Sequence, residues 1–138
     1  MPRPSVWLIR ASLICLAAGF TFGAGMLANE GLAVGIRLES LRPAHVEILL
    51  MGWVMQLALG VAYWILPRFT RGLPRGNATA AWLSMILLNA GILLVVLQPI
   101  FHDPWFGLLG RVLEAAGILA FLLVSWRRLR PSATPAAR

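Results

Sequence analysis

Four long stretches of the chain consist almost entirely of apolar residues, and shorter polar stretches separate them. They cover residues 6–28, 44–66, 79–100 and 104–126. A stretch of about 22 residues makes roughly 33 Å of α-helix, which is enough to cross the hydrocarbon core of a bilayer. The pattern therefore predicts an all-α integral membrane protein, built as a bundle of four helices.

The composition agrees with this membrane assignment. Of the 138 residues, 59% are hydrophobic and 12% are charged, and a mean hydropathy of +0.80 is unlike that of an ordinary soluble domain. All twelve basic residues are arginines, and most lie at the ends of apolar stretches. The net positive charge therefore indicates membrane topology, and we expect no nucleic-acid partner. The one cysteine, Cys15, lies inside an apolar stretch, which excludes a disulfide framework.

The arginines alternate between the two sides of the predicted bundle. One side collects both ends of the chain and the loop between the second and third helices, with Arg3, Arg10, Arg68, Arg71, Arg75, Arg127, Arg128, Arg130 and Arg138. On the other side the charges of Glu30, Arg37, Glu39 and Arg42 cancel. Because arginine-rich loops stay on the cytoplasmic side, we expect both termini to be cytoplasmic in a multi-pass protein of the bacterial inner membrane. Residues 1–130 would form one transmembrane domain, and residues 131–138 a short cytoplasmic tail.

The second apolar stretch carries its polar residues on one predicted face. At about 100° per residue, Gly52, Gln56 and Tyr63 return to within roughly 20° of the direction of His45. Glu47 points almost the opposite way, and a carboxylate in a first helical turn is favourable for the helix dipole.

Two interpretations of this face remain open. In the first, His45 binds haem iron through one ring nitrogen, Gly52 gives a porphyrin room to pass, and Arg37 and Arg42 pair with the propionates. In the second, Gly52 lets two helices approach closely, Gln56 makes an interhelical hydrogen bond, and His45 is a polar residue at the membrane interface.

The residues Leu-Arg-Pro-Ala-His-Val at 41–46, followed by Gly52 and by Ala-Tyr-Trp-Ile-Leu-Pro at 62–67, resemble a known pattern. They are similar to the second transmembrane helix of haem–copper oxidase subunit I, closest to the cbb-type oxidases and nitric oxide reductases. The resemblance implies that His45 is an axial ligand of a low-spin haem b near the outer face of the membrane. It covers only a part of the chain. As a separate difference, the family's subunit has many more helices than the four predicted here.

The helices that carry the family's second haem ligand and its copper-site histidines have no counterpart here. No complete catalytic centre is therefore visible in one chain, and whether the protein is an enzyme stays open. A four-helix relative would resemble one arc of the family's subunit, so we expect a homo-oligomer or a subunit of a larger membrane complex.

Several other polar groups lie in or between the apolar stretches. Arg111 and Glu114 are three residues apart on the fourth helix and are predicted to form an ion pair, or else to serve a proton path or hold a ligand. His102 lies in the turn before that helix. It is a candidate second haem ligand, a partner of His45 in a copper or zinc site, or a solvent-facing residue. Gly19 and Gly23 form a G-x-x-x-G pattern that predicts a packing face.

The sequence thus favours a membrane haem b-binding protein of electron transfer. Two alternatives remain. One is a cofactor-free accessory subunit of a respiratory or photosynthetic complex, and the other is a copper-, zinc- or quinone-binding protein at the outer face.

Overall fold

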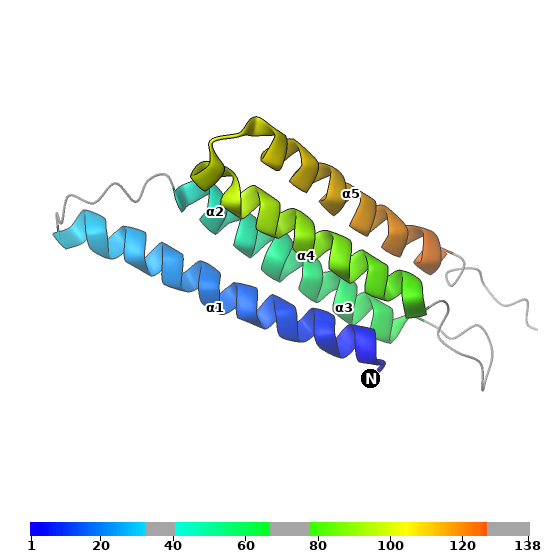
Figure 1. Cartoon of the computed structure of the whole chain (residues 1–138). Coiled ribbons are helices and arrows are strands. Elements are labelled where there is room, and N and C mark those ends of the chain that lie inside the picture. The colour runs from blue at the N-terminus through cyan, green and yellow to red at the C-terminus, as the bar shows by residue number, and fades with distance from the viewer. Residues whose placement is uncertain (33–40, 67–77, 127–138) are drawn as a thin grey trace, which may run out of the picture.

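The computed structural model describes residues 1–32, 41–66 and 78–126, and within these ranges all regular structure is helical (Figure 1). Four helical rods run side by side. The first is α1, the second is continuous but made of the three segments α2, η2 and α3, and the last two are α4 and α5. Their bounds are Arg3–Leu32 for α1, Arg42–Glu47 for α2, Ile48–Met55 for η2, Gln56–Ile65 for α3, Ala78–Phe101 for α4 and Pro104–Trp126 for α5.

The four predicted membrane helices are confirmed, with adjusted ends. Each rod is long and apolar enough to cross a bilayer. The first helix is longer than the predicted 6–28, because its helical structure begins at Arg3 and continues to Leu32. The polar residues Asn29 and Glu30 therefore belong to the helix, although they mark the end of its apolar stretch. We describe the fold as a multi-pass membrane bundle.

Two pairs of helices make up the bundle. α1 lies along η2 and α3 of the second rod, and α4 packs most extensively against α5 (Figure 1). The end where α2 begins and α4 ends carries both histidines, and we call it the histidine end. The core between the pairs draws on all four rods, with Leu8, Leu59, Tyr63, Ala81, Leu88, Ile92 and Phe121.

Glycines bring α4 and α5 into backbone contact. A Cβ atom added at Gly91 would lie 2.6 Å from the carbonyl oxygen of Gly110 and 2.9 Å from the amide nitrogen of Glu114. Near the other end of this pair, the Ser84 hydroxyl donates a hydrogen bond of 2.7 Å to the Gly117 carbonyl. Small residues and polar groups of this kind are what hold helices together in lipid, where apolar contact alone gives little preference for another helix.

The second rod changes its helical type near its middle. Between Ile48 and Met55 the backbone is a π-helix (η2), in which each hydrogen-bonded ring includes one residue more than in an α-helix. The sequence pattern did not predict this segment. A π-turn rotates each residue by a smaller angle than an α-turn does. The face predicted for His45, Gly52, Gln56 and Tyr63 assumed about 100° per residue, so it does not continue through this rod.

Candidate functional site

The His45 ring lies between α2 and two glycines of α1. Its Nδ1 is 2.8 Å from the carbonyl oxygen of Gly19, and a Cβ atom added at Gly23 would lie 2.8 Å from its Cε1. Because a carbonyl only accepts, Nδ1 carries a proton, and in the neutral ring Nε2 holds the lone pair. Nε2 has no hydrogen-bond partner among the described residues.

The predicted packing face of Gly19 and Gly23 is therefore confirmed, and it receives the side chains of the second rod. Besides His45, the Leu49 side chain lies against Gly19, within the space that a Cβ atom there would need. The sequence shows that α1 has a flat strip, but it does not show that His45 lies on it.

The other residues of the predicted His45 face have different partners. Gly52 is buried against α1, where an added Cβ would lie 2.8 Å from the Cys15 sulfur. Gln56 is buried and donates from Nε2 to Asn89 Oδ1 of α4 over 2.8 Å. The buried ring of Tyr63 has its centroid 6.4 Å from that of Phe121 on α5.

The structure does not bring these four side chains onto one surface. His45 and Gly52 face α1, whereas Gln56 and Tyr63 face α4 and α5. The π-helix η2 separates the His45 end of the rod from Gln56 and Tyr63. Interhelical packing through Gly52 and the Gln56 hydrogen bond are both present, as the second sequence interpretation expects.

Of the two candidate propionate ligands, only Arg42 belongs to the described residues. It is exposed at the first position of α2, three residues before His45 and so on the same side of the helix. Arg37 lies outside the described ranges.

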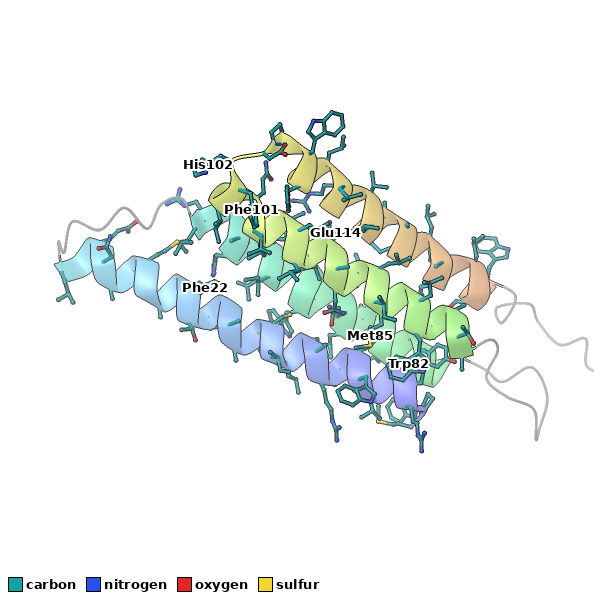
Figure 2. All side chains as sticks on the ribbon, viewed as in Figure 1. Phe22, Trp82, Met85, Phe101, His102 and Glu114 are labelled. Carbon is teal, nitrogen blue, oxygen red and sulfur yellow. The ribbon has the colours of Figure 1, made fainter. Side chains whose placement is uncertain are left out.

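A cluster of three charged side chains joins α2 to α5. Arg111 donates from Nη1 to Glu114 Oε2 over 3.0 Å and to Glu47 Oε2 over 2.6 Å. The predicted Arg111–Glu114 pair is confirmed, and Glu47 is its unexpected third member. Both carboxylates are almost fully buried, with exposed side-chain fractions of 4% for Glu47 and 1% for Glu114. Figure 2 shows Glu114 on the fourth rod's inner side, between α5 and α4.

The sequence did carry a signal for Glu47. Within the apolar stretches of 44–66 and 104–126, Glu47, Arg111 and Glu114 are the only acidic or arginine residues before the last turn. Ionisable groups in such segments tend to pair with one another. The interpretation of Glu47 through the helix dipole missed this pairing because the dipole argument considers one helix alone.

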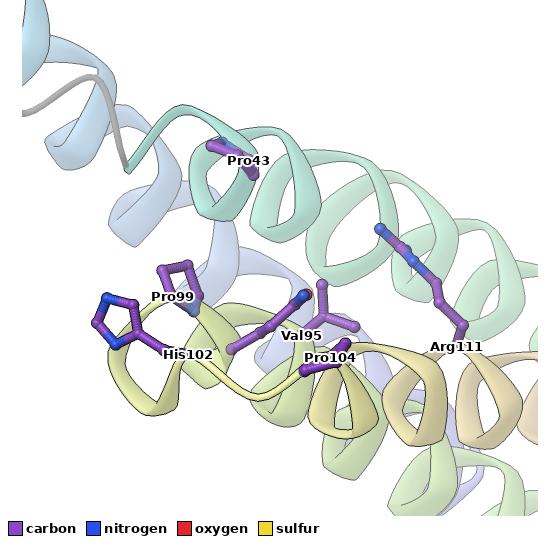
Figure 3. A pocket seen from close by; sticks show the side chains of 7 residues that line it. Pro43, Val95, Pro99, His102, Pro104 and Arg111 are labelled. Carbon is purple, nitrogen blue, oxygen red and sulfur yellow. The ribbon is translucent and has the colours of Figure 1, made fainter.

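A cavity of about 410 Å³ opens beside this cluster at the histidine end (Figure 3). It lies where α2, α4 and α5 meet, and Arg111 reaches past it from α5 toward the second rod (Figure 3). Most of the cavity lining is apolar, and the polar side chains in it are Gln98, His102 and Arg111. The remaining lining residues are Pro43, Val95, Pro99 and Pro104.

His102 lies in the turn between α4 and α5 (Figure 2) and is one of the residues that line this cavity (Figure 3). It is exposed, has a positive φ of 52°, and its Nδ1 is 3.1 Å from the carbonyl oxygen of Ile100. In the part of the chain that the structure describes, no group of three or more histidine, cysteine or acidic side chains lies close enough to hold a metal ion. The copper or zinc alternative therefore has no three-ligand set there, and Glu47 is already paired with Arg111.

Comparison with protein-family models, with curated proteins and with solved structures finds no match for this chain. The fold and the site together define a multi-pass helical membrane protein. At one end it carries a backbone-anchored histidine and two buried glutamates that pair with one partly exposed arginine.

Proposed function

We propose that this protein binds haem b in the membrane and takes part in electron transfer, with His45 as one axial ligand. The observation that supports this proposal is the 2.8 Å contact between His45 Nδ1 and the Gly19 carbonyl. Ligating histidines commonly donate their second ring N–H to a carbonyl or carboxylate, which fixes the ring and the tautomer. Nε2 then presents its lone pair to the metal. Haem would supply reversible one-electron chemistry.

The residues around His45 define how a haem would be held. His45 is half-buried, so its ring is partly accessible at the bundle surface, and exposed Arg42 one turn away would pair with a propionate. Gly52 would not contribute, because Cys15 already covers it. Gln56 and Tyr63 lie beyond η2 on the same rod and support the bundle, each through its own contacts.

The second axial ligand would come from another histidine. The chain has only two histidines, and His102 lies in a different turn, at the cavity edge. A haem shared between His45 residues of two copies would make the functional unit a homo-oligomer. The exposed apolar residues of α1 near His45, which include Phe20 and Leu27, would then be available for contact with a second copy.

An absorption spectrum of the purified protein, oxidised and reduced, tests this proposal. We expect a Soret band that is lost in His45→Ala and retained in His102→Ala, with one haem for two chains. Imidazole added to His45→Gly should restore the band, because the free ring can occupy the space against Gly23. A colourless protein from haem-supplied cells would refute the proposal, as would a band unchanged in His45→Ala.

The alternative proposal is a cofactor-free accessory subunit of a larger membrane complex. It is supported by the large share of α1 that the other rods leave uncovered. A colourless protein that purifies only together with other subunits would favour it over haem binding.

The orientation also belongs to the proposal. Arg3 and Arg10 at the start of α1, with the arginines of 67–77 and 127–138, support cytoplasmic termini in a bacterial inner membrane. The histidine end would then lie at the outer face.

A further inference from the structure

The cluster of Glu47, Arg111 and Glu114 has unequal numbers of acidic and basic groups. Two carboxylates and one guanidinium carry a net charge of −1 when all three are ionised. No lysine or further arginine pairs with them among the described residues, and α4, which packs on both α2 and α5, has no ionisable side chain from Ala78 to Phe101. An uncompensated charge inside a membrane helix is costly, so the cluster needs one positive charge more than the described residues supply.

The geometry shows where that charge would bind. Both carboxyl groups accept from the same Arg111 nitrogen, Nη1, through their Oε2 atoms, so the two groups are neighbours. Their other oxygens, Glu47 Oε1 and Glu114 Oε1, are buried and have no hydrogen-bond partner in the described structure. A buried polar atom without a partner is unfavourable. A proton on one carboxyl group supplies an O–H donor to the other, and it brings the net charge of the cluster to zero.

The cavity gives this cluster a polar connection to the histidine end. Arg111, whose side chain is 56% exposed, both lines the cavity and bonds the two carboxylates. Gln98 and His102 are the other polar side chains of the lining. Water in the cavity would therefore bring a proton as far as Arg111, whose Nη1 contacts both carboxyl groups, although neither glutamate itself lines the cavity.

We propose that Glu47 and Glu114 share one exchangeable proton, held beside Arg111 and reached from the cavity at the histidine end. This site is separate from the proposed haem site, because it uses neither His45 nor Arg42. Its test does not depend on whether the protein binds haem.

Infrared spectroscopy of the full-length protein in lipid nanodiscs tests the proposal. At about pH 6, where exposed carboxyl groups are already ionised, we expect the carbonyl stretch of a protonated carboxylic acid, shifted in D₂O, that disappears as the pH is raised further. Incorporation of ¹³C-labelled glutamate should shift the same band, which excludes Asp103 as its source and needs no variant. Glu47→Gln and Glu114→Gln should each abolish the band, because Arg111 then balances the single carboxylate that remains.

Glu30→Gln is the matched control, since Glu30 is exposed at the end of α1, and it should leave the band unchanged. The proposal is overturned if the wild-type protein shows no acid band at about pH 6, or if the band survives both single variants. It is also overturned if sodium is the bound cation. In that case the acid band would be absent, and sodium salts would raise the unfolding temperature above that in choline salts.

Discussion

Gly91 shows at the scale of one residue how closely the α4–α5 pair is packed. In an exposed helical position, replacing glycine by alanine stabilises a helix by up to about 1 kcal/mol. At Gly91 the new methyl group would meet the Gly110 carbonyl at 2.6 Å and the Glu114 amide nitrogen at 2.9 Å. Both are backbone atoms that cannot rotate away, so α4 and α5 must separate.

We therefore expect Gly91→Ala to lower the free energy of unfolding by about 1–3 kcal/mol, the usual cost of overpacking. Gly25→Ala is the control, because an added Cβ there meets nothing within 4 Å, and it should be neutral or slightly stabilising. Unfolding in mixed micelles with increasing SDS, followed by circular dichroism, measures both. Equal effects of the two variants would contradict the close contact.

Single residues also show how far the sequence alone could lead. The Arg111–Glu114 pair was predictable because its two members lie three apart on one helix. The contacts of Glu47 with Arg111, of His45 with Gly19 and of Gly52 with Cys15 each join two helices. Such contacts depend on how the helices rotate and slide against each other, and the apolar pattern of a membrane helix does not fix that rotation because most of its faces are hydrophobic.

At the scale of one element, the π-helix η2 allows a deletion test. A π-turn contains one residue more than an α-turn, so removing one residue from η2 can convert it to α-helix without turning the rest of the rod. Leu50 is suitable because it lies in η2 and is 58% exposed. We expect its deletion to change the free energy of unfolding by no more than about 1 kcal/mol.

Deletion of Leu93 is the matched control, since Leu93 is also 58% exposed but lies within regular α4. Its loss rotates every following residue by about 100° and removes Val95 from the core, so we expect a loss of more than about 4 kcal/mol. SDS unfolding measures both deletions. A Leu50 deletion as damaging as the Leu93 deletion would show that the π geometry itself is required.

The helices themselves were predictable for a simple physical reason. Every backbone polar group must be satisfied within a membrane segment, so an apolar stretch of sufficient length is helical whatever its detailed sequence. The same reason does not predict the π-helix, because π and α hydrogen bonds satisfy the backbone N–H and C=O groups equally well. Residues of η2 do pack closely on α1, Gly52 against Cys15 and Leu49 against Gly19, and contacts of this kind are not visible in the apolar pattern of one helix.

At the scale of the whole molecule, many large apolar side chains point outward from the bundle. Leu13, Ile14, Ile86 and Leu123 are among those exposed, on three different rods. A water-soluble protein rarely tolerates apolar surface of this extent, whereas lipid tails solvate it well. The polar interactions are instead gathered inside the bundle, as in the Gln56–Asn89 hydrogen bond. This inverted distribution supports a lipid environment, but it carries no information about which end faces the cytoplasm.

The arginine distribution supports the proposed orientation, and it yields a prediction for the chain as a whole. We expect a cytoplasmic C-terminus, because arginine-rich segments resist translocation. Green fluorescent protein fused to it should therefore be fluorescent, and alkaline phosphatase fused to it should be inactive. Fusions truncated after Leu32, at the histidine end, should show the opposite pattern. Replacing the loop arginines Arg68, Arg71 and Arg75 by glutamine should weaken this preference and yield a population with mixed orientations.

Phosphatase activity at the C-terminus of the unchanged chain would place the histidine end in the cytoplasm. The proposed haem site at His45 and the proposed proton site beside Arg111 would then face that compartment, and not the outer face.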